Sequence, residues 1–163
     1  MDNTIDNNIK KPVQHIVCLI PARGGSKGIP NKNIKLLNGK PLINYSIETS
    51  LQSKLINKTI VTTGSNEIAD VAKNAGASVP FLRPSEISQD KSPDIDFFKH
   101  YLEWVKDNNE VEPTMIVQLR PTYPIRDSKF LDECITKFIN EKDKYDSLRT
   151  VIKIEKSPFK MYH

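Results

Sequence analysis

The order of apolar and polar residues along the chain predicts an alternation of buried strands and amphipathic helices. Continuous apolar or β-branched runs, each bounded by polar or turn residues, are typical of strands whose two faces are both covered. Five such runs predict strands, at residues 15–20, 58–63, 78–81, 114–119 and 146–154. The segments between them carry apolar residues at helical spacing, which predicts a mostly parallel sheet with helices on both faces.

Three of the predicted helices each combine one apolar stripe with a start signal. The stripes are Ile43, Ile47 and Leu51; Ile68, Val71 and Ala72; and Leu131, Ile135 and Phe138. Pro41 suits the first turn of the first helix, and Ser65 caps the second. Asp127 or Ser128 caps the last of the three, after a proline-rich loop that is not helical.

The longest predicted helix begins at residues 92–94, where serine caps, proline starts the first turn and aspartate faces the positive end of the helix dipole. Its expected core face is a stripe of four apolar residues, Ile95, Phe98, Leu102 and Val105. A second stripe of Phe97, Tyr101 and Trp104 runs beside the first, and we expect it to contact the core or another subunit.

A glycine-rich loop, P-A-R-G-G-S-K-G-I-P-N-K-N, follows the first predicted strand. It brings Arg23, Lys27 and Lys32 together with the hydroxyl of Ser26. Two glycines alone would be interpreted more simply as a surface turn whose lysines keep the chain soluble. Three cations directly after a buried strand favour phosphate binding instead. The Walker loop does not fit, because Lys27 precedes the third glycine and no hydroxyl residue follows. The dinucleotide fingerprint G-x-G-x-x-G does not fit the glycine spacing either, and Pro30 opposes a helix that starts here. We interpret it as a loop that holds a nucleoside triphosphate from the side.

A second cationic loop, with Arg120 and Arg126, follows the strand predicted at 114–119. Because ligands of parallel sheets bind beyond the carboxyl ends of the strands, we expect the two loops to meet there. The residues alone therefore predict a site for an anionic ligand.

Composition limits the remaining classes of function. The 163 residues suffice for one domain with a core, which we place at 14–163 after a flexible arm at 1–13. The net charge of +4 is spread among acidic residues, so we expect no nucleic acid partner. We expect no membrane span, no signal peptide and no zinc site. Cys18 and Cys134 fall in a predicted strand and a predicted helix, and buried reduced thiols suit the cytoplasm.

The glycine-rich loop resembles the signature of the CMP-sialic acid synthetases (acylneuraminate cytidylyltransferases) and of relatives that activate legionaminic acid. Further matches follow in the same order along the chain, at residues 39–43, 67–69, 79–84, 121–126 and 157–160. The resemblance implies a Rossmann-like nucleotide-diphospho-sugar transferase fold. It also implies an enzyme that transfers CMP from CTP to a nonulosonic (sialic- or legionaminic-type) acid, releases pyrophosphate and uses Mg²⁺.

The same resemblance assigns roles to individual residues. Arg23 and Lys27 are expected to hold the triphosphate with help from Ser26, and Lys32 to lie near the reacting phosphate. We expect Arg23 and Lys32 to be the catalytic pair. Two further residues, Asn33 and Arg83, are expected to contact the nucleotide, and the backbone at Ala22 to approach the cytosine. The expected sugar-binding residues are Arg120, Thr122 and Arg126.

The chain also departs from the family pattern. Residues 62–64 lack the acid that the family usually has there, Asp94 stands where hydroxyl residues often touch the nucleotide, and Arg120 replaces a frequent glutamine. The chain stops at His163 inside a family motif, before the dimerisation segment and before the late aspartates that hold Mg²⁺ in the family. The metal ligands are therefore unknown, and a homodimer or a complementing chain is open. The alternatives are a non-catalytic nucleotide-binding remnant that needs a partner chain, and a related nucleotidyltransferase that uses another sugar.

Overall fold

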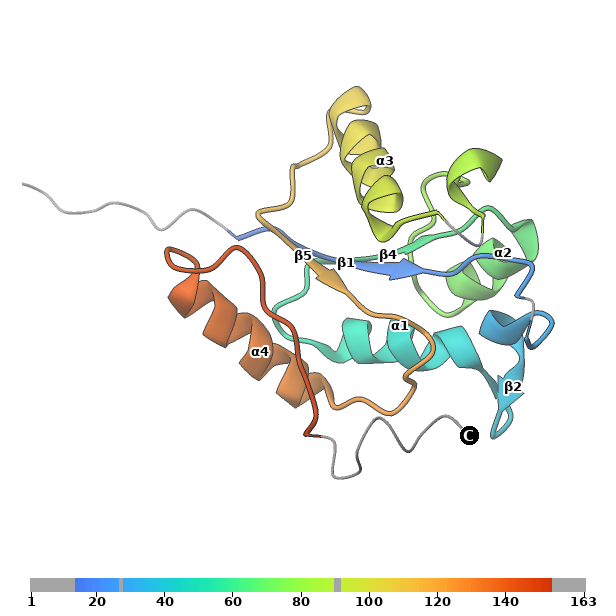
Figure 1. The fold of residues 1–163 in the computed structure, drawn as a ribbon, viewed down its shortest axis with the longest axis horizontal. Coiled ribbons are helices and arrows are strands. Elements are labelled where there is room, and N and C mark those ends of the chain that lie inside the picture. Colours follow the sequence, from blue (N-terminus) through green and yellow to red (C-terminus); the bar gives the residue numbers. More distant parts are fainter. Residues whose placement is uncertain (1–13, 27, 90–91, 154–163) are drawn as a thin grey trace, which may run out of the picture.

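The computed structural model describes three stretches of the chain, residues 14–26, 28–89 and 92–153 (Figure 1). Some sequence-based predictions fall outside these residues. They are the N-terminal arm at 1–13, the role of Lys27 and the family motif at 157–160.

A three-stranded parallel sheet forms the centre of the described molecule (Figure 1). Its middle strand is β1 (Ile16–Pro21), which pairs with β4 (Lys58–Thr62) on one side and with β5 (Met115–Gln118) on the other. The first five residues of β1 are at most 2% exposed. This burial explains why the strand is apolar at every position rather than at alternate ones.

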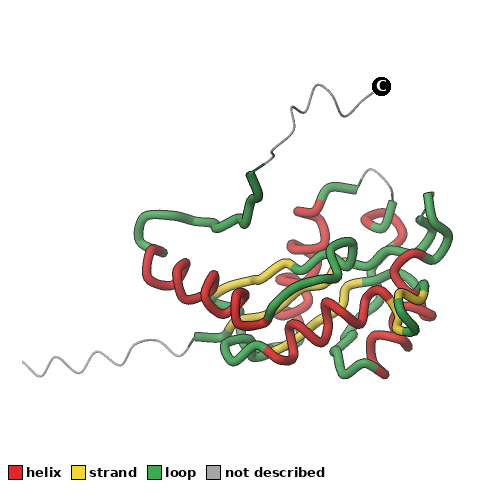
Figure 2. The backbone as a smooth tube through the Cα atoms, turned by 90° about the horizontal axis from the view of Figure 1, so that it is seen from below, coloured by secondary structure: helices red, strands yellow, loops and turns green. Residues whose placement is uncertain are grey.

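Helices cover both faces of the sheet, as the sequence predicts. One face packs against α1 (Leu42–Gln52), α2 (Asn66–Asn74) and α4 (Ser128–Glu141), and the other packs against α3 (Asp94–Asp107). Figure 1 shows α3 above the sheet with α1 and α4 below it, and Figure 2 shows helices crossing in front of the strands. The α/β class with a mostly parallel sheet is confirmed.

Short elements connect the strands to the helices. The turn predicted at 38–39 joins β2 (Leu36–Leu37) to β3 (Lys40–Pro41), and Asn38 and Gly39 both have positive φ there. Two 3₁₀ turns complete the connections: η1 (Lys32–Ile34) lies in the loop that follows β1, and η2 (Ser85–Ile87) lies between α2 and α3. No helix within the described residues is long and apolar enough to cross a membrane.

Two predicted strands are wrong. Residues 78–81 contribute a single parallel bridge between Ser78 and Ile60. The ladder stops because Pro80 has no N–H with which to continue it. Residues 146–153 contain no strand, and Val151 and Ile152 are 88% and 87% exposed. No described strand pairs with this segment, so its apolar side chains have no layer to pack against.

The predicted core faces of α1 and α3 need correction. In α3 the buried residues are Phe97, Tyr101 and Val105, whereas Ile95 and Leu102 are 53% and 43% exposed. Both stripes have helical spacing, and the larger aromatic one gains more from burial, so it turns toward the sheet. In α1, Leu51 is 51% exposed because it lies in the last turn of the helix, at the edge of the layer.

The predicted helix caps are confirmed at two starts and wrong at one. Ser65 Oγ accepts a hydrogen bond from the backbone N of Ile68 (3.4 Å), and Asp127 Oδ1 accepts one from the backbone N of Lys129 (2.9 Å). Ser92 does not cap α3, because its hydroxyl donates to the backbone oxygen of Glu86 (3.3 Å). That bond ties the polar loop before α3 to itself.

Candidate functional site

A cavity of about 310 Å³ lies beyond the carboxyl ends of β1 and β5. Its walls come from the glycine-rich loop, the loop that precedes α3, the first turn of α3 and the loop that follows β5. Five predicted site residues from the nucleotide set line it together, namely Arg23, Ser26, Lys32, Asn33 and Arg83. Arg120 and Thr122 from the predicted sugar-binding set line it as well. The meeting of the two cationic loops at this edge is confirmed.

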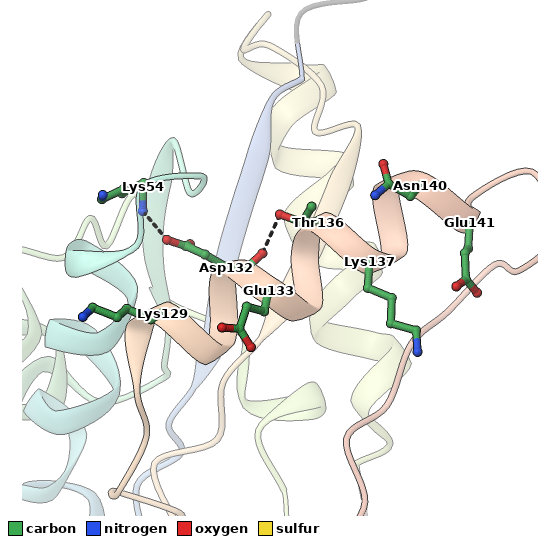
Figure 3. Close-up of a pocket in the computed structure, with 8 residues that line it drawn as sticks. All are labelled: Lys54, Lys129, Asp132, Glu133, Thr136, Lys137, Asn140 and Glu141. Atoms are coloured by element: carbon green, nitrogen blue, oxygen red, sulfur yellow. Dashed lines mark hydrogen bonds between the residues drawn. The ribbon is translucent and has the colours of Figure 1, made fainter.

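A second, larger hollow of about 710 Å³ runs along the outer surface of α4 (Figure 3). Its lining alternates in charge, with Lys129 and Lys137 beside Glu133 and Glu141. Asp132 there accepts hydrogen bonds from the end of α1, which explains its position structurally. This surface lacks the concentration of one charge sign that distinguishes the first cavity.

The glycine-rich loop is held in shape by its own polar groups. Asn33 is 6% exposed, and its side-chain Nδ2 donates to the backbone oxygen of Arg23 (2.9 Å). Ala22 is fully buried, and its backbone N donates to the oxygen of Thr62 (3.0 Å), which extends the β1–β4 pairing into the loop. Ala22 does not line the cavity, so its approach to cytosine stays a prediction.

Arg83 is the most buried cation of the site, with 7% of its surface exposed. Its backbone N donates to the oxygen of Thr63 (2.7 Å), which fixes the loop after β4. Burial lowers the pKa of Arg83, the nearby charge of Arg23 lowers it further, and Asp94 opposes both effects. Its Nε has no hydrogen-bond partner among the described residues. A buried guanidinium with an unused donor is suited to an anionic ligand.

Gly64 is a contributor that the sequence did not reveal. A Cβ atom at this position would lie 2.9 Å from the backbone oxygen of Arg83. Glycine therefore allows the segment carrying Arg83 to pass close to the end of β4. The departure from the family pattern at residues 62–64 has this steric consequence.

The loop after β5 divides its predicted sugar-binding residues between two places. Arg120 lines the cavity and forms an ion pair with Asp94, the first residue of α3. Arg126 does not line the cavity; its Nη1 donates to Ser46 Oγ of α1 (3.0 Å), and its Nη2 donates to the backbone oxygen of Arg120 (2.8 Å). Arg126 therefore supports the loop from behind, and its contact with a sugar stays a prediction.

Several lining residues were not assigned to the site from the sequence. They come from the polar loop before α3 and from α3 itself, namely Ile87, Ser88, Gln89, Ser92 and Phe97. The polar composition of this loop was the available signal, because surface loops carry binding residues in α/β folds.

The described residues do not fit a magnesium site. Among them, no group of three or more His, Cys, Asp or Glu side chains is placed to hold a metal ion. Asp94, the carboxylate that lines the cavity, already accepts hydrogen bonds from Gln118 and Arg120. Mg²⁺ prefers several oxygen ligands and waters, so this carboxylate alone is an insufficient donor set.

Sequence comparison connects this geometry with known proteins. A family model described as cytidylyltransferase matches residues 17–162. The N-acylneuraminate cytidylyltransferase of Escherichia coli O18:K1:H7 is 39% identical over 141 residues, which cover 86% of this chain and 32% of that protein. The CMP-N,N'-diacetyllegionaminic acid synthase of Legionella pneumophila is 42% identical over 111 residues, which cover 68% of this chain and 47% of that protein.

Structure comparison supports the same fold. A CMP:2-keto-3-deoxy-manno-octonic acid synthetase solved in complex with CTP superposes with a TM-score of 0.65 at 20% identity. The superposition covers 79% of this chain and 49% of the solved one. This likeness concerns the fold. In each of these comparisons the chain spans half or less of the length of the protein it matches.

Proposed function

The chain belongs to the cytidylyltransferase family, and we propose that it serves the transfer of CMP from CTP to a nonulosonic acid with release of pyrophosphate. The observation that carries the proposal is the charge of the cavity. Four cationic side chains and one carboxylate line it among the described residues: Arg23, Lys32, Arg83, Arg120 and Asp94. A triphosphate and a sugar acid are both anions, and the surplus of positive charge matches them.

In the proposed reaction, the anomeric hydroxyl of the acid attacks the α-phosphorus of CTP. A bond forms between that oxygen and phosphorus, the bond to the bridging oxygen breaks, and pyrophosphate leaves with the negative charge. The hydroxyl proton is released to solvent. Such a reaction needs positioning and charge neutralisation more than a covalent protein intermediate.

The nucleotide side of the cavity supplies both requirements. Arg23, Ser26 and Lys32 come from one loop and can bind neighbouring phosphate oxygens. Arg83 approaches from the segment between α2 and α3 with an unused donor. Fixed cations stabilise charge that develops on the phosphates without having to reorganise during the step.

The resemblance makes Mg²⁺ an expected cofactor, and this remains a proposal. When bound, Mg²⁺ would neutralise charge on the phosphates. The described residues offer no ligand set for it, so the roles given above belong to the side chains of the cavity alone. A cytoplasmic location and a homodimer or complementing chain likewise stay predictions.

The test is pyrophosphate release from CTP and Mg²⁺ with a panel of sialic, legionaminic and pseudaminic acids. We expect release with at least one acid and loss of CTP binding in Arg23→Ala. Lys35→Ala is the matched control, because Lys35 is an exposed cation just after the loop that does not line the cavity. CTP binding that survives Arg23→Ala would contradict the placement of the phosphates.

A second candidate is a nucleotide-binding chain that needs a partner for catalysis. The observation in its favour is the lining of the cavity, in which the described residues include one carboxylate and offer no ligand set for Mg²⁺. CTP binding without pyrophosphate release, in a folded chain and with every acid of the panel, would favour this candidate over the first.

A further inference from the structure

Asp94 is an unexpected carboxylate in a cavity built for anions. It is the first residue of α3, and about 41% of its side chain is exposed. Among the described lining residues it is the one acidic group, and its negative charge would repel a phosphate or a sugar carboxylate. Its presence in the lining therefore requires a reason other than contact with the ligand.

The contacts of Asp94 supply that reason. Its Oδ2 accepts a hydrogen bond from Gln118 Nε2 (3.0 Å) and a second one from Arg120 Nη2. Gln118 ends β5, and Arg120 follows two residues later, so both side chains leave an extended backbone on the same side. One oxygen of α3 thus binds two neighbouring side chains of the strand end.

The backbone of Arg120 is fixed separately. Its carbonyl oxygen accepts a hydrogen bond from Arg126 Nη2 (2.8 Å), and Arg126 Nη1 donates to Ser46 Oγ (3.0 Å) in α1. Arg120 is therefore held at its backbone from the α1 side of the sheet and at its guanidinium from the α3 side.

We propose that Asp94 is a positioning residue for Arg120, and that the positioned guanidinium binds the carboxylate of the acceptor acid. The second half of this inference rests on the proposed function. Arginine has five N–H donors in a planar fork, and Nη2 carries two of them, so its bond to Asp94 leaves a second Nη2 hydrogen that lies parallel to the N–H of either Nε or Nη1. Two parallel donors are the arrangement that binds a carboxylate in bidentate fashion.

The alternative is that Asp94 occupies the place of the ligand's carboxylate and is displaced by it. Gln118 argues against this, because it anchors Asp94 independently of Arg120. The two arrangements predict opposite signs. Removing the charge of Asp94 weakens acid binding if Asp94 positions Arg120, and strengthens it if Asp94 competes with the acid.

The first experiment needs no substrate. The side-chain Nε–Hε signal of Arg120, assigned through its loss in Arg120→Gln, reports the order of the guanidinium by NMR relaxation. Asp94→Asn should lower the order parameter of this signal. Asp96→Asn is the matched control, because Asp96 lies in the same first turn of α3 and does not line the cavity. An unchanged order parameter in Asp94→Asn would overturn the positioning role.

The second experiment measures the binding of N-acetylneuraminic acid and of its methyl ester to the 163-residue chain saturated with CDP, which has no pyrophosphate to release. We expect Asp94→Asn and Arg120→Gln each to weaken binding of the acid about fivefold. This is the largest effect expected from an ion pair as exposed as that between Asp94 and Arg120. The double variant should lose no more than either single one, and the ester should be insensitive to all three.

Each other outcome has a distinct meaning. Additive losses, or tighter acid binding in Asp94→Asn, would overturn the inference about Asp94 and leave the proposed function standing. If no acid of the sialic, legionaminic or pseudaminic type binds the CDP-saturated chain, the carboxylate role of Arg120 is overturned. A failure to bind CTP or CDP at all would instead overturn the proposed function itself.

Discussion

Replacing Arg83 with methionine should separate the binding function of the cavity from its stability. Arg83 is 7% exposed, its pKa is lowered by burial and by Arg23, and its Nε has no partner among the described residues. Methionine has a similar length and fills the space without charge. The guanidinium is therefore removed with little change in packing.

Two opposing contributions set the change in stability. An unsatisfied buried polar group costs about 1–3 kcal/mol, and its removal recovers that cost. The guanidinium carbon lies 5.9 Å from the centroid of the Phe97 ring, and loss of this contact costs about 0.5–1 kcal/mol. We therefore expect Arg83→Met to raise the free energy of unfolding by about 1 kcal/mol.

Ligand affinity should change in the opposite direction. A hydrogen bond to a charged group contributes about 1.5–3 kcal/mol, so CTP affinity should fall about 10- to 150-fold. Calorimetry with CTP and urea unfolding without ligand measure the two quantities. Lys35→Met is the control, since it removes an equal charge at an exposed position outside the cavity. CTP affinity equal to that of Lys35→Met, or a less stable Arg83→Met, would refute the argument.

Three further predictions concern the framework of the site. Gly64→Ala places a Cβ 2.9 Å from the Arg83 backbone oxygen, so urea unfolding should show a free energy of unfolding lower by about 1–3 kcal/mol. Gly28→Ala is the control, because nothing lies within 4 Å of a Cβ there, and equal unfolding midpoints for the two variants would contradict the prediction. Arg126→Met loses the hydrogen bonds to α1 and to the loop after β5, so the free energy of unfolding should fall by about 1–3 kcal/mol. An unchanged unfolding midpoint would show that these two hydrogen bonds do not stabilise the fold. Burial raises the pKa of Cys18 from 9.0 to about 12, so the folded state keeps the proton longer than the unfolded one. The stability that Cys18 contributes should therefore fall from pH 9 upward, and a Cys18→Val variant should show a shallower decline.

Local spacing was sufficient to predict three strands of the sheet and two helix starts. The runs at 15–20, 58–63 and 114–119 became strands because each is apolar or β-branched throughout and is covered on both faces. Ser65 and Asp127 could be identified as caps because a cap bonds its own first turn. These features depend on residues within a few positions of one another.

Features that depend on distant neighbours were not predictable in this way. The rotation of α3 depends on the sheet that it packs against, so spacing alone could not choose between the Phe97 stripe and the Ile95 stripe. The segment at 146–153 has the composition of a strand and has no described strand beside it. Strand propensity reflects the packing of side chains on a sheet, so a segment with high strand propensity forms no strand where it has no neighbouring strand.

The sequence by itself determined that cations from two loops would meet at the carboxyl edge of a parallel sheet. Local patterns were sufficient for this, because they show where strands and loops follow one another along the chain and which residues each loop carries. Only the tertiary structure decided their individual positions. It brought Arg83 into the buried wall, turned Arg126 toward Ser46, and set Asp94 against Arg120. Asp94 and Arg120 are 26 residues apart in the chain, and contacts over such separations arise from the packing of whole elements, which no local pattern encodes.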